Sequence, residues 1–421
     1  MALVVQKFGG TSVADPDRIR AVADHVARTR RRGDSVVLVI SAMGKETDEL
    51  LRLADEVAGE KPGREMDMLI TAGERKATAL VSMALQAIGV PASSFTGSQA
   101  GFLTDTNHMN AKILDVRPER VRECLAAGAV PVVGGAQGVS SVTRDVTFLG
   151  RGGSDTTAVA LAHVLGAASC ELYTDVSGVF SADPRLVPVA RRMSQISFDE
   201  LLEMTATGCP KPAMRSVEFA RTFRVPLHVR SAFTWERGTL VIEEETAVTS
   251  GTHSGAQSSM EASSVLAVTH DAGEAKVTVS GVIDKPGIAA SLFRRLADQG
   301  VNVDMIVQNV ASAGAGGATD ISFTVPKEML DLSLQVAREA LGDIGARDVS
   351  GDRDIAKVSI IGAGMKSDPG VAARMFETLA DCAINIEMIS TSPIRTSCVI
   401  AEEHVERAVQ ALHTAFGLDA E

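Results

Sequence analysis

The chain has 421 residues, of which 45% are hydrophobic and only 4% are aromatic, and its formal net charge is −12. This length exceeds one ordinary hydrophobic core and predicts two or three domains. The acidic charge balance argues against a nucleic-acid or membrane surface, so we expect no partner of either kind.

Cysteine usage and hydropathy predict a soluble protein of the cytoplasm. The five cysteines are widely spaced and form no CxxC pair, which is typical of free thiols in a reducing compartment. We expect neither a disulfide framework nor a zinc site. Residues 2–5 begin a strand rather than a signal peptide, and no apolar run reaches the ~18 residues needed to cross a bilayer.

The first half of the chain alternates strands with helices. We expect strands over 4–8, 35–41, 129–133 and 170–175, and helices over 15–31, 46–58, 64–88, 118–127 and 156–165. The unbroken apolar run 36–40 favours a strand covered on both faces. The alternation predicts an α/β domain with a doubly wound, mainly parallel sheet over residues 1–245. Lys7, Ser41 and Asp175 lie at or next to strand ends, so they should share the rim where such sheets bind ligands.

The composition changes after residue 245. Residues 246–264 are small and polar and predict a flexible linker. Beyond the linker lies an internal repeat, in which residues 276–279, 286–287 and 301–304 recur as 357–360, 369–370 and 384–387. Both copies read as a strand, a helix that begins at Pro-Gly, and a second strand. This pattern predicts two duplicated small domains, over 265–345 and 355–421.

A glycine-rich turn at residues 149–157 opens the helix predicted at 156–165. Glycines let a backbone approach a ligand closely, and a helix start offers free N–H groups to an anion. Arg151 adds a planar fork that can hold a carboxylate or a phosphate at two points. Ser154 or Asp155 could equally be a simple helix N-cap.

Several charged residues suit phosphoryl transfer, which must hold phosphates, neutralise charge and orient an acceptor. Lys7 precedes a Gly-Gly turn, and Asp175 could hold Mg²⁺ or orient a lysine. Arg185 offers a second cation. Glu74 and Arg151 could hold a substrate that carries both an amine and a carboxylate. A carboxylate acceptor is already ionised and needs no general base.

Plainer interpretations remain for each of these residues. Lys7 could be a rim charge, Glu74 and Arg75 a surface pair, and Asp175 a turn residue. The residues alone therefore predict an anion-binding α/β enzyme with duplicated C-terminal modules, without naming its substrate.

Seven segments, in order along the chain, resemble motifs of the aspartate kinases. They are residues 7–13, 41–44, 71–75, 94–97, 143–145, 149–158 and 173–185. The repeats resemble the paired ACT regulatory domains of that family, which have a βαββαβ fold. The resemblance implies an amino-acid-kinase fold that uses ATP and Mg²⁺ to convert L-aspartate to 4-phospho-L-aspartate, the first step towards lysine, threonine and methionine.

The resemblance also implies roles at matching positions. The catalytic residues would be Lys7 and Asp175. Aspartate would be bound by Ser41, Thr47, Glu74, Arg151, Gly152, Gly153 and Ser154. The nucleotide would be bound by Lys7, Phe8, Gly9, Gly10, Tyr173, Thr174, Asp175, Val179, Phe180, Asp183, Arg185 and Lys211. Lysine or threonine would act as effectors at Asp284, Pro286, Gly287, Ala289, Asn302, Asp304, Gln308, Val371, Ala372, Asn385 and Ile386.

The chain departs from the family pattern near the substrate. Ala136 stands where the family usually has phenylalanine, Phe148 stands where it has threonine, and Pro210 replaces a nucleotide-contacting lysine, with Lys211 next to it. Two alternatives therefore stay open: a kinase for a different amino-acid-like carboxylate, and a catalytically weak subunit that senses amino acids. We expect a homo-oligomer, or pairing with a separate copy of the regulatory half that starts at Met260.

Overall fold

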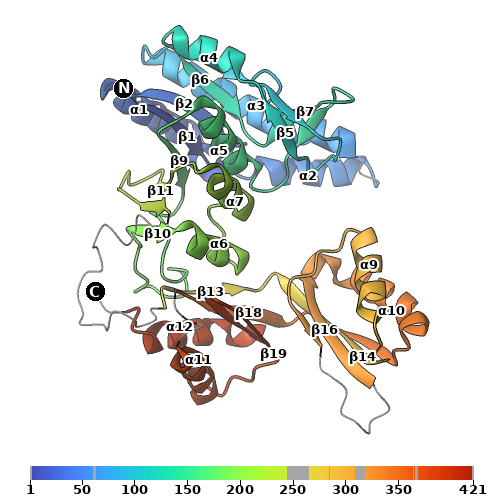
Figure 1. Ribbon diagram of the computed structural model, residues 1–421. Helices are drawn as coiled ribbons and strands as arrows, with labels where there is room; N and C mark the ends of the chain where they lie inside the picture. The colour runs from blue at the N-terminus through green and yellow to red at the C-terminus, as the bar shows by residue number, and fades with distance from the viewer. Residues whose placement is uncertain are drawn as a thin grey trace. The chain divides into compact units, whose positions relative to one another are not determined.

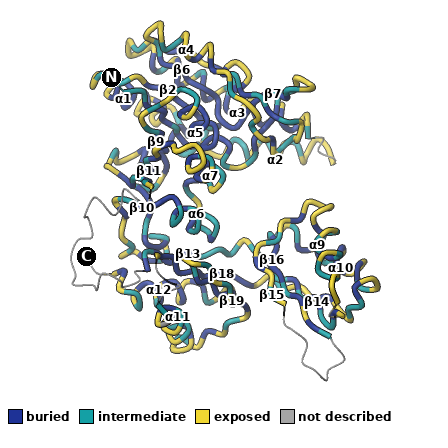
Figure 2. The backbone as a smooth tube through the Cα atoms, in the orientation of Figure 1, coloured by how far each residue is buried: buried dark blue, intermediate teal, exposed yellow. Residues whose placement is uncertain are grey.

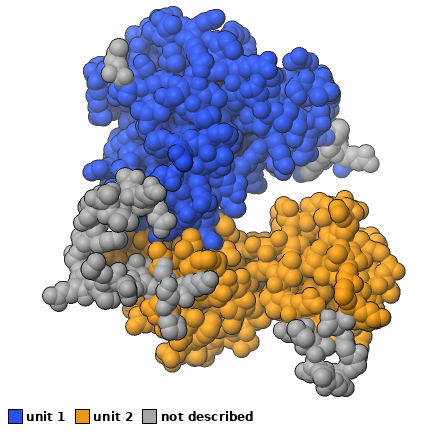
Figure 3. Space-filling model, in the orientation of Figure 1, with its two compact units in different colours: residues 1–179, 192–205, 210–255 blue, residues 180–191, 206–209, 256–421 orange. Residues whose placement is uncertain are grey.

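The computed structural model describes residues 2–59, 63–243, 265–283, 285–308, 318–363, 365 and 368–419. The chain divides into two compact units (Figure 3). Unit 1 comprises residues 1–179, 192–205 and 210–255, and unit 2 comprises residues 180–191, 206–209 and 256–421. The predicted linker, including Met260, lies outside the described residues. Within the described part, no helix combines the length and apolar character needed to cross a membrane.

Unit 1 is built on an eight-stranded sheet in the order β10-β12-β11-β9-β1-β2-β6-β3 (Figure 1). These strands are β1 (Leu3–Phe8), β2 (Ser35–Ile40), β3 (Ala92–Phe95), β6 (Val130–Gly134), β9 (Ser169–Thr174), β10 (Gln195–Ser197), β11 (Leu227–Ser231) and β12 (Thr239–Ile242). Every pairing is parallel except that of β11 with β12. The predicted doubly wound, mainly parallel sheet is confirmed.

Helices cover both faces of this sheet, because its central strands are apolar on both faces (Figure 2). The helices are α1 (Pro16–Arg31), α2 (Glu46–Val57), α3 (Gly63–Ala87), α4 (Glu119–Ala126), α5 (Gly153–Leu165), α6 (Phe198–Ala206) and α7 (Met214–Phe223). Leu38 and Ile40 share one core with α1 and α3. The neighbouring Val37 and Val39 are fully buried on the other face, and α5 contacts the same strands.

Local sequence signals account for two of the helix starts. Asp15 caps α1 by accepting a hydrogen bond from the Arg18 N–H at 2.9 Å, and Pro16 occupies the first helical position. This start agrees with the prediction. Helix α5 begins at Gly153, three residues before the predicted start, because Gly152 at φ 73° turns the chain directly into the helix.

A smaller four-stranded sheet in unit 1 has the order β5-β4-β7-β8. Its strands are β4 (Phe102–Thr104), β5 (Ile113–Val116), β7 (Gln137–Ser140) and β8 (Val146–Phe148). A turn at residues 135–136 joins β6 of the main sheet to β7 of the small one. Strand β7 of the small sheet therefore starts next to the carboxyl end of β6, at the carboxyl edge of the large sheet.

Unit 2 contains two four-stranded sheets with helices, in the orders β15-β16-β14-β17 and β13-β18-β20-β19. The first repeat domain contains β14 (Glu274–Ile283), α9 (Ile288–Asp298), β15 (Ile306–Gln308), β16 (Ala318–Pro326), α10 (Leu330–Ile344) and β17 (Asp348–Asp352). The second repeat domain contains β13 (Ala267–Asp271), β18 (Ile355–Ile361), α11 (Pro369–Asp381), β19 (Met388–Ser392), β20 (Arg395–Ala401) and α12 (Val405–Ala415).

The sheets of the two repeat domains interleave along the chain. Strand β13 falls within the predicted first domain, 265–345, but it pairs with β18 of the second. Strand β17, predicted to lie between the domains, completes the first sheet by pairing with β14. All residues of β18 are buried, so this strand needs a neighbour on each side, and β13 supplies one.

The strands predicted at 301–304 and 384–387 begin later, at Ile306 and Met388. Before Ile306 the pairing is irregular: the Asp304 N–H donates to the Thr324 carbonyl, while the Thr324 N–H donates to the Met305 carbonyl. This offset interrupts a regular ladder.

Candidate active site

The carboxyl ends of β1, β2 and β9 bring Lys7, Ser41 and Asp175 to the same edge of the main sheet, because β1 pairs in parallel with both neighbours. The predicted shared rim is confirmed. A Cβ atom on Gly10 would lie 2.7 Å from the Ala42 carbonyl oxygen, so only glycine fits where these turns meet.

The ammonium group of Lys7 is held at this rim by Asp155, with 2.5 Å between Lys7 Nζ and Asp155 Oδ1. The same ammonium lies 3.5 Å from the place that a Cβ atom of Gly9 would take. Asp155 also accepts a hydrogen bond from the Ala213 N–H at 3.2 Å. The ion pair thus fixes a cation beside the backbone of the Gly-Gly turn and next to the start of α5.

Asp155 is a residue that the sequence reasoning placed only as a possible N-cap. That interpretation is wrong, because Gly152 is the N-cap and both Ser154 and Asp155 lie inside α5. The sequence signal that could have indicated a role for Asp155 at the rim is its position just after the glycine pair at 152–153. Its partner, Lys7, lies 148 residues earlier in the chain, and the pairing follows from the contact of α5 with β1.

The start of α5 packs closely against the turn that follows β6. A Cβ atom on Gly135 would lie 2.5 Å from Ser154 Oγ. Gly153 and Ser154 are buried, whereas Arg151 is exposed. The loop thus carries an exposed arginine two residues before the first residue of α5.

Glu74 lies on α3 and is only 3% exposed, so it is not a surface-pair residue. Burial, with a further contribution from the nearby Glu46 carboxylate, raises the pKa of Glu74 to about 7. Among the described residues, nothing donates a hydrogen bond to Glu74 Oε2. A buried carboxylate with a vacant acceptor suits a cationic group such as a ligand ammonium.

Helix α3 reaches the rim through the turn after β2. A Cβ atom on Gly73 would lie 2.9 Å from the Ala42 Cβ atom, so helix and turn are in contact. Ser41 lies in this turn, and Thr47 follows in the first turn of α2. Glu46 is held by Lys76 of α3 at 2.5 Å, a pair that the sequence reasoning did not anticipate.

Asp175 follows β9 and accepts hydrogen bonds from Lys211 Nζ at 2.9 Å and from Thr174 Oγ1 at 2.8 Å. Partial burial opposes ionisation of Asp175, but these two donors outweigh it and lower its pKa. Of the two predicted roles of Asp175, orienting a lysine is therefore realised with Lys211. The lysine next to Pro210 has a defined position at the rim.

The side chains of Phe8 and Tyr173 belong to the core rather than to a ligand site. Both are fully buried, and their rings stack with centroids 4.6 Å apart. The Tyr173 hydroxyl donates to Glu171 Oε2 at 2.9 Å and is 2.8 Å from His25 Nε2. The predicted nucleotide role of Phe8 and Tyr173 is thereby restricted to backbone atoms, of which the Tyr173 carbonyl accepts from the Gly9 N–H.

The remaining predicted nucleotide residues fall in two units. Val179 is buried in unit 1, and its N–H donates to Thr239 Oγ1 at 2.9 Å. Phe180, Asp183 and Arg185 belong to unit 2, where Arg185 Nη2 is 2.6 Å from Asp183 Oδ2. The structure therefore brings Lys7, Asp155, Asp175 and Lys211 to one sheet edge, and it describes Phe180, Asp183 and Arg185 with the other unit.

Acidic and basic residues connect the two repeat domains reciprocally. Lys357 is 1% exposed, and its Nζ atom lies 2.6 Å from Glu274 Oε1 and 2.5 Å from Asp304 Oδ2. At the corresponding position of the other repeat, Lys276 pairs with Glu387. The predicted effector residue Asp304 is thus already in an ion pair.

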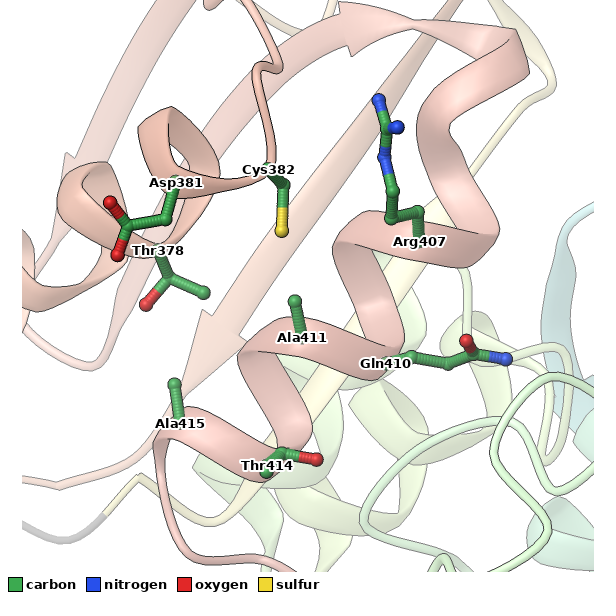
Figure 4. A pocket seen from close by; sticks show the side chains of 8 residues that line it. All are labelled: Thr378, Asp381, Cys382, Arg407, Gln410, Ala411, Thr414 and Ala415. Atoms are coloured by element: carbon green, nitrogen blue, oxygen red, sulfur yellow. The ribbon is translucent and has the colours of Figure 1, made fainter.

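The other predicted effector residues are distributed over both repeat domains. Those that are exposed are Pro286, Gly287, Asn302, Gln308 and Asn385, those that are partly buried are Ala289, Ala372 and Ile386, and the buried one is Val371. Asp284 lies outside the described residues. A separate open hollow of about 540 Å³ between α11 and α12 is lined by residues such as Arg407, Asp381 and Cys382 (Figure 4). None of the predicted effector residues lines this hollow.

Within the described residues, no group of three or more His, Cys, Asp or Glu side chains could hold a metal ion. The five cysteines are present as thiols, in agreement with the prediction.

Comparison with known proteins identifies the class. The model of the amino acid kinase family matches residues 2–231, and the ACT domain model matches residues 277–341 and 358–416. The chain therefore belongs to the amino acid kinase family and carries paired ACT domains.

Its relatives within that family are aspartokinases. The aspartokinase of Mycolicibacterium smegmatis is 50% identical over 421 residues, which cover 99% of this chain and 97% of that protein. The aspartokinase of Corynebacterium glutamicum is 50% identical over 427 residues, which cover 100% of this chain and 97% of that protein.

Solved structures of aspartate kinases are also similar to this chain. The aspartate kinase from Synechocystis is 42% identical, with a TM-score of 0.53, over 99% of this chain and 69% of that one. E. coli aspartokinase III in complex with aspartate and ADP has the same fold, with a TM-score of 0.79 at 24% identity, over 98% of this chain and 99% of that one.

Proposed function

We propose that the chain is an aspartate kinase, which transfers the γ-phosphoryl group of ATP to the side-chain carboxylate of L-aspartate. The observation that carries the site assignment is the Lys7–Asp155 ion pair beside the Gly9–Gly10 turn. A fixed ammonium next to glycine backbone at a helix start is what a transferring phosphoryl group requires.

Glu74 and Arg151 would hold the substrate. The buried Glu74 carboxylate, with its vacant Oε2, would accept the α-ammonium group of aspartate, and Arg151 would bind a carboxylate at two points. Ser41, Thr47 and the backbone of residues 152–154 would complete this site. Aspartate held at both ends would present its side-chain carboxylate to the phosphoryl group near Lys7.

The reaction then needs charge neutralisation more than proton transfer. The acceptor carboxylate is ionised at neutral pH, so no general base is required. Lys7 would stabilise the negative charge that spreads over the transferring phosphoryl oxygens, and Asp155 would keep the lysine in place. Lys211, held by Asp175, would neutralise the nucleotide phosphates.

Mg²⁺ fits this donor set. Magnesium in kinases is commonly bound by one or two carboxylates together with substrate phosphates, and it supplies positive charge that offsets the phosphate oxygens. Asp175 is the exposed rim carboxylate that would contribute, consistent with the lack of a larger acidic cluster among the described residues.

Lysine, threonine or both would act as effectors through the ACT domains, and the chain would function as a homo-oligomer or together with a separate copy of its regulatory half. E. coli aspartokinase III, a structural neighbour, is known in complex with lysine and aspartate. The relatives lend no support to a kinase for another carboxylate or to a sensing subunit.

A hydroxylamine-trapping assay tests the proposal. The purified chain is incubated with ATP, Mg²⁺ and either L-aspartate, L-glutamate or succinate, and acyl hydroxamate is measured. We expect aspartyl hydroxamate, with Lys7→Met as the inactive control. Turnover with another acid only, or with none, would overturn the proposal.

A further inference from the structure

Ala136 lies beside the proposed aspartate-binding loop in an unusual conformation. Its φ angle is 57°, in the left-handed region that residues other than glycine rarely adopt. A Cβ atom on Gly153 would lie 2.9 Å from the Ala136 Cβ atom and 2.8 Å from that of Leu149. The Leu149 N–H donates to the Ala136 carbonyl at 2.8 Å. The turn and the glycine loop are therefore one closely packed body.

Phe148 joins this body to helix α3. The ring is 8% exposed and packs in a hydrophobic cluster that includes Met66 and Ile70. These two residues and Glu74 follow one another at four-residue intervals, so they lie along one side of α3. Phe148 itself is three residues before Arg151. The ring thus packs against the helix that carries Glu74, and the backbone of Phe148, the last residue of β8, leads into the loop that carries Arg151.

Ala136 belongs to the same cluster as Phe148. The aspartate kinase pattern has phenylalanine and threonine at these two positions, whereas this chain has alanine and phenylalanine. Each of the two pairs contains one aromatic ring, so their total side-chain volumes are similar. Core exchanges that conserve volume are the ones that packing tolerates best.

We propose that Phe148, together with the small Ala136, is a positioning residue that sets the separation between Glu74 and Arg151 and so selects an amino acid of the length of aspartate. This inference rests on the proposed function, because it uses the substrate roles of Glu74 and Arg151. A smaller side chain at position 148 leaves part of the contact unfilled, and α3 and the loop then lose their fixed spacing.

The test is an exchange series: Phe148→Thr, Ala136→Phe, and the double variant Ala136→Phe/Phe148→Thr. We expect Phe148→Thr to raise KM for aspartate about 10-fold and to lower the preference for aspartate over glutamate by a similar factor, as mispositioned binding groups do. Values of kcat and of KM for ATP should stay within about 2-fold, because neither Lys7 nor the nucleotide residues belong to the cluster. Ala136→Phe alone should also impair aspartate binding through overpacking.

The double variant should bring KM for aspartate back to within about 3-fold of the parent, which requires coupling between the two positions. Phe95→Thr is the matched control, because Phe95 is 7% exposed in β3 and lies outside this cluster. It should leave the aspartate/glutamate preference unchanged. If Phe148→Thr does not fold, Phe148→Leu replaces it in the series.

An unchanged KM for aspartate in a folded Phe148 variant would overturn the inference, as would a double variant whose defect equals the product of the single defects. Glu74→Gln separates this from failure of the proposed function. If Glu74→Gln raises KM for aspartate and Phe148→Thr does not, only the inference fails. If neither changes it, the proposed substrate site fails as well.

Discussion

Glu74 makes aspartate binding depend on pH near neutrality. Burial raises its pKa to about 7, whereas an ordinary glutamate has a pKa of 4.5. The ionised fraction is then about nine tenths at pH 8 and about one tenth at pH 6. Only the ionised form attracts an ammonium group, so kcat/KM for aspartate should fall about 10-fold between pH 8 and pH 6.

The same pKa has a consequence for stability. Between pH 4.5 and pH 7 the folded chain holds a proton on Glu74 that the unfolded chain has released, so the free energy of unfolding decreases as pH rises through this window. The total decrease is about 3 kcal/mol, from 1.36 kcal/mol for each pH unit between the two pKa values. Bound aspartate supplies a cation to the carboxylate and should offset this loss.

The assay is kcat/KM for aspartate from pH 6 to pH 8 at saturating ATP, for the parent chain and for Glu74→Gln. Glu74→Gln should have a lower kcat/KM with a flat profile, and Glu49→Gln, at an exposed position on α2, is the control that should keep the parent profile. Thermal unfolding with and without aspartate provides the second measurement. A flat parent profile, or an equal slope in Glu74→Gln, would refute the reasoning.

Further predictions concern the other ion pairs. Lys7→Met should abolish turnover, while aspartate should still raise the melting temperature of this variant. Asp155→Asn should lower kcat by about 100-fold, because Lys7 loses its fixed position. Hydroxamate formation and thermal shift measure both effects. Lys211→Ala should raise KM for ATP several-fold without changing KM for aspartate, and an unchanged KM for ATP would contradict its phosphate role. Lys357→Met leaves Glu274 buried beside a second carboxylate and should destabilise unit 2 by about 3 kcal/mol in urea unfolding, a loss that pairing with Glu274→Gln should reduce.

Much of unit 1 could be predicted because its signals are local. The apolar run in β2, the Asp15-Pro16 start of α1 and the glycine turns each identify an element from a few adjacent residues. The shared rim followed from the parallel order of the strands. The burial of Glu74 could not be predicted, because its carboxylate is covered by packing of α3 against the turn at residue 42.

Contacts between distant segments were the part that sequence reasoning missed. Asp155 is of a residue type that is common at helix N-caps and lies near the start of a helix. Only the packing of α5 beside β1 gives it Lys7 as a partner. Tyr173 lies in a motif that resembles nucleotide-binding positions, yet its ring stacks on Phe8 in the core. Strand β13 precedes the first repeat and carries no local signal that it pairs with β18.

The pairing of β13 with β18 also decides how the regulatory half can be divided. The first repeat domain is inserted into the second. During synthesis, residues 274–352 are therefore made before β18, the strand with which β13 pairs. A fragment that starts at Met260 retains every strand of both sheets and can be self-sufficient, whereas one that starts at Glu274 exposes an open edge along β18. A truncation before β13 therefore leaves a complete regulatory fragment. A truncation just after β13 leaves a fragment that is prone to associate through the unpaired edge of β18.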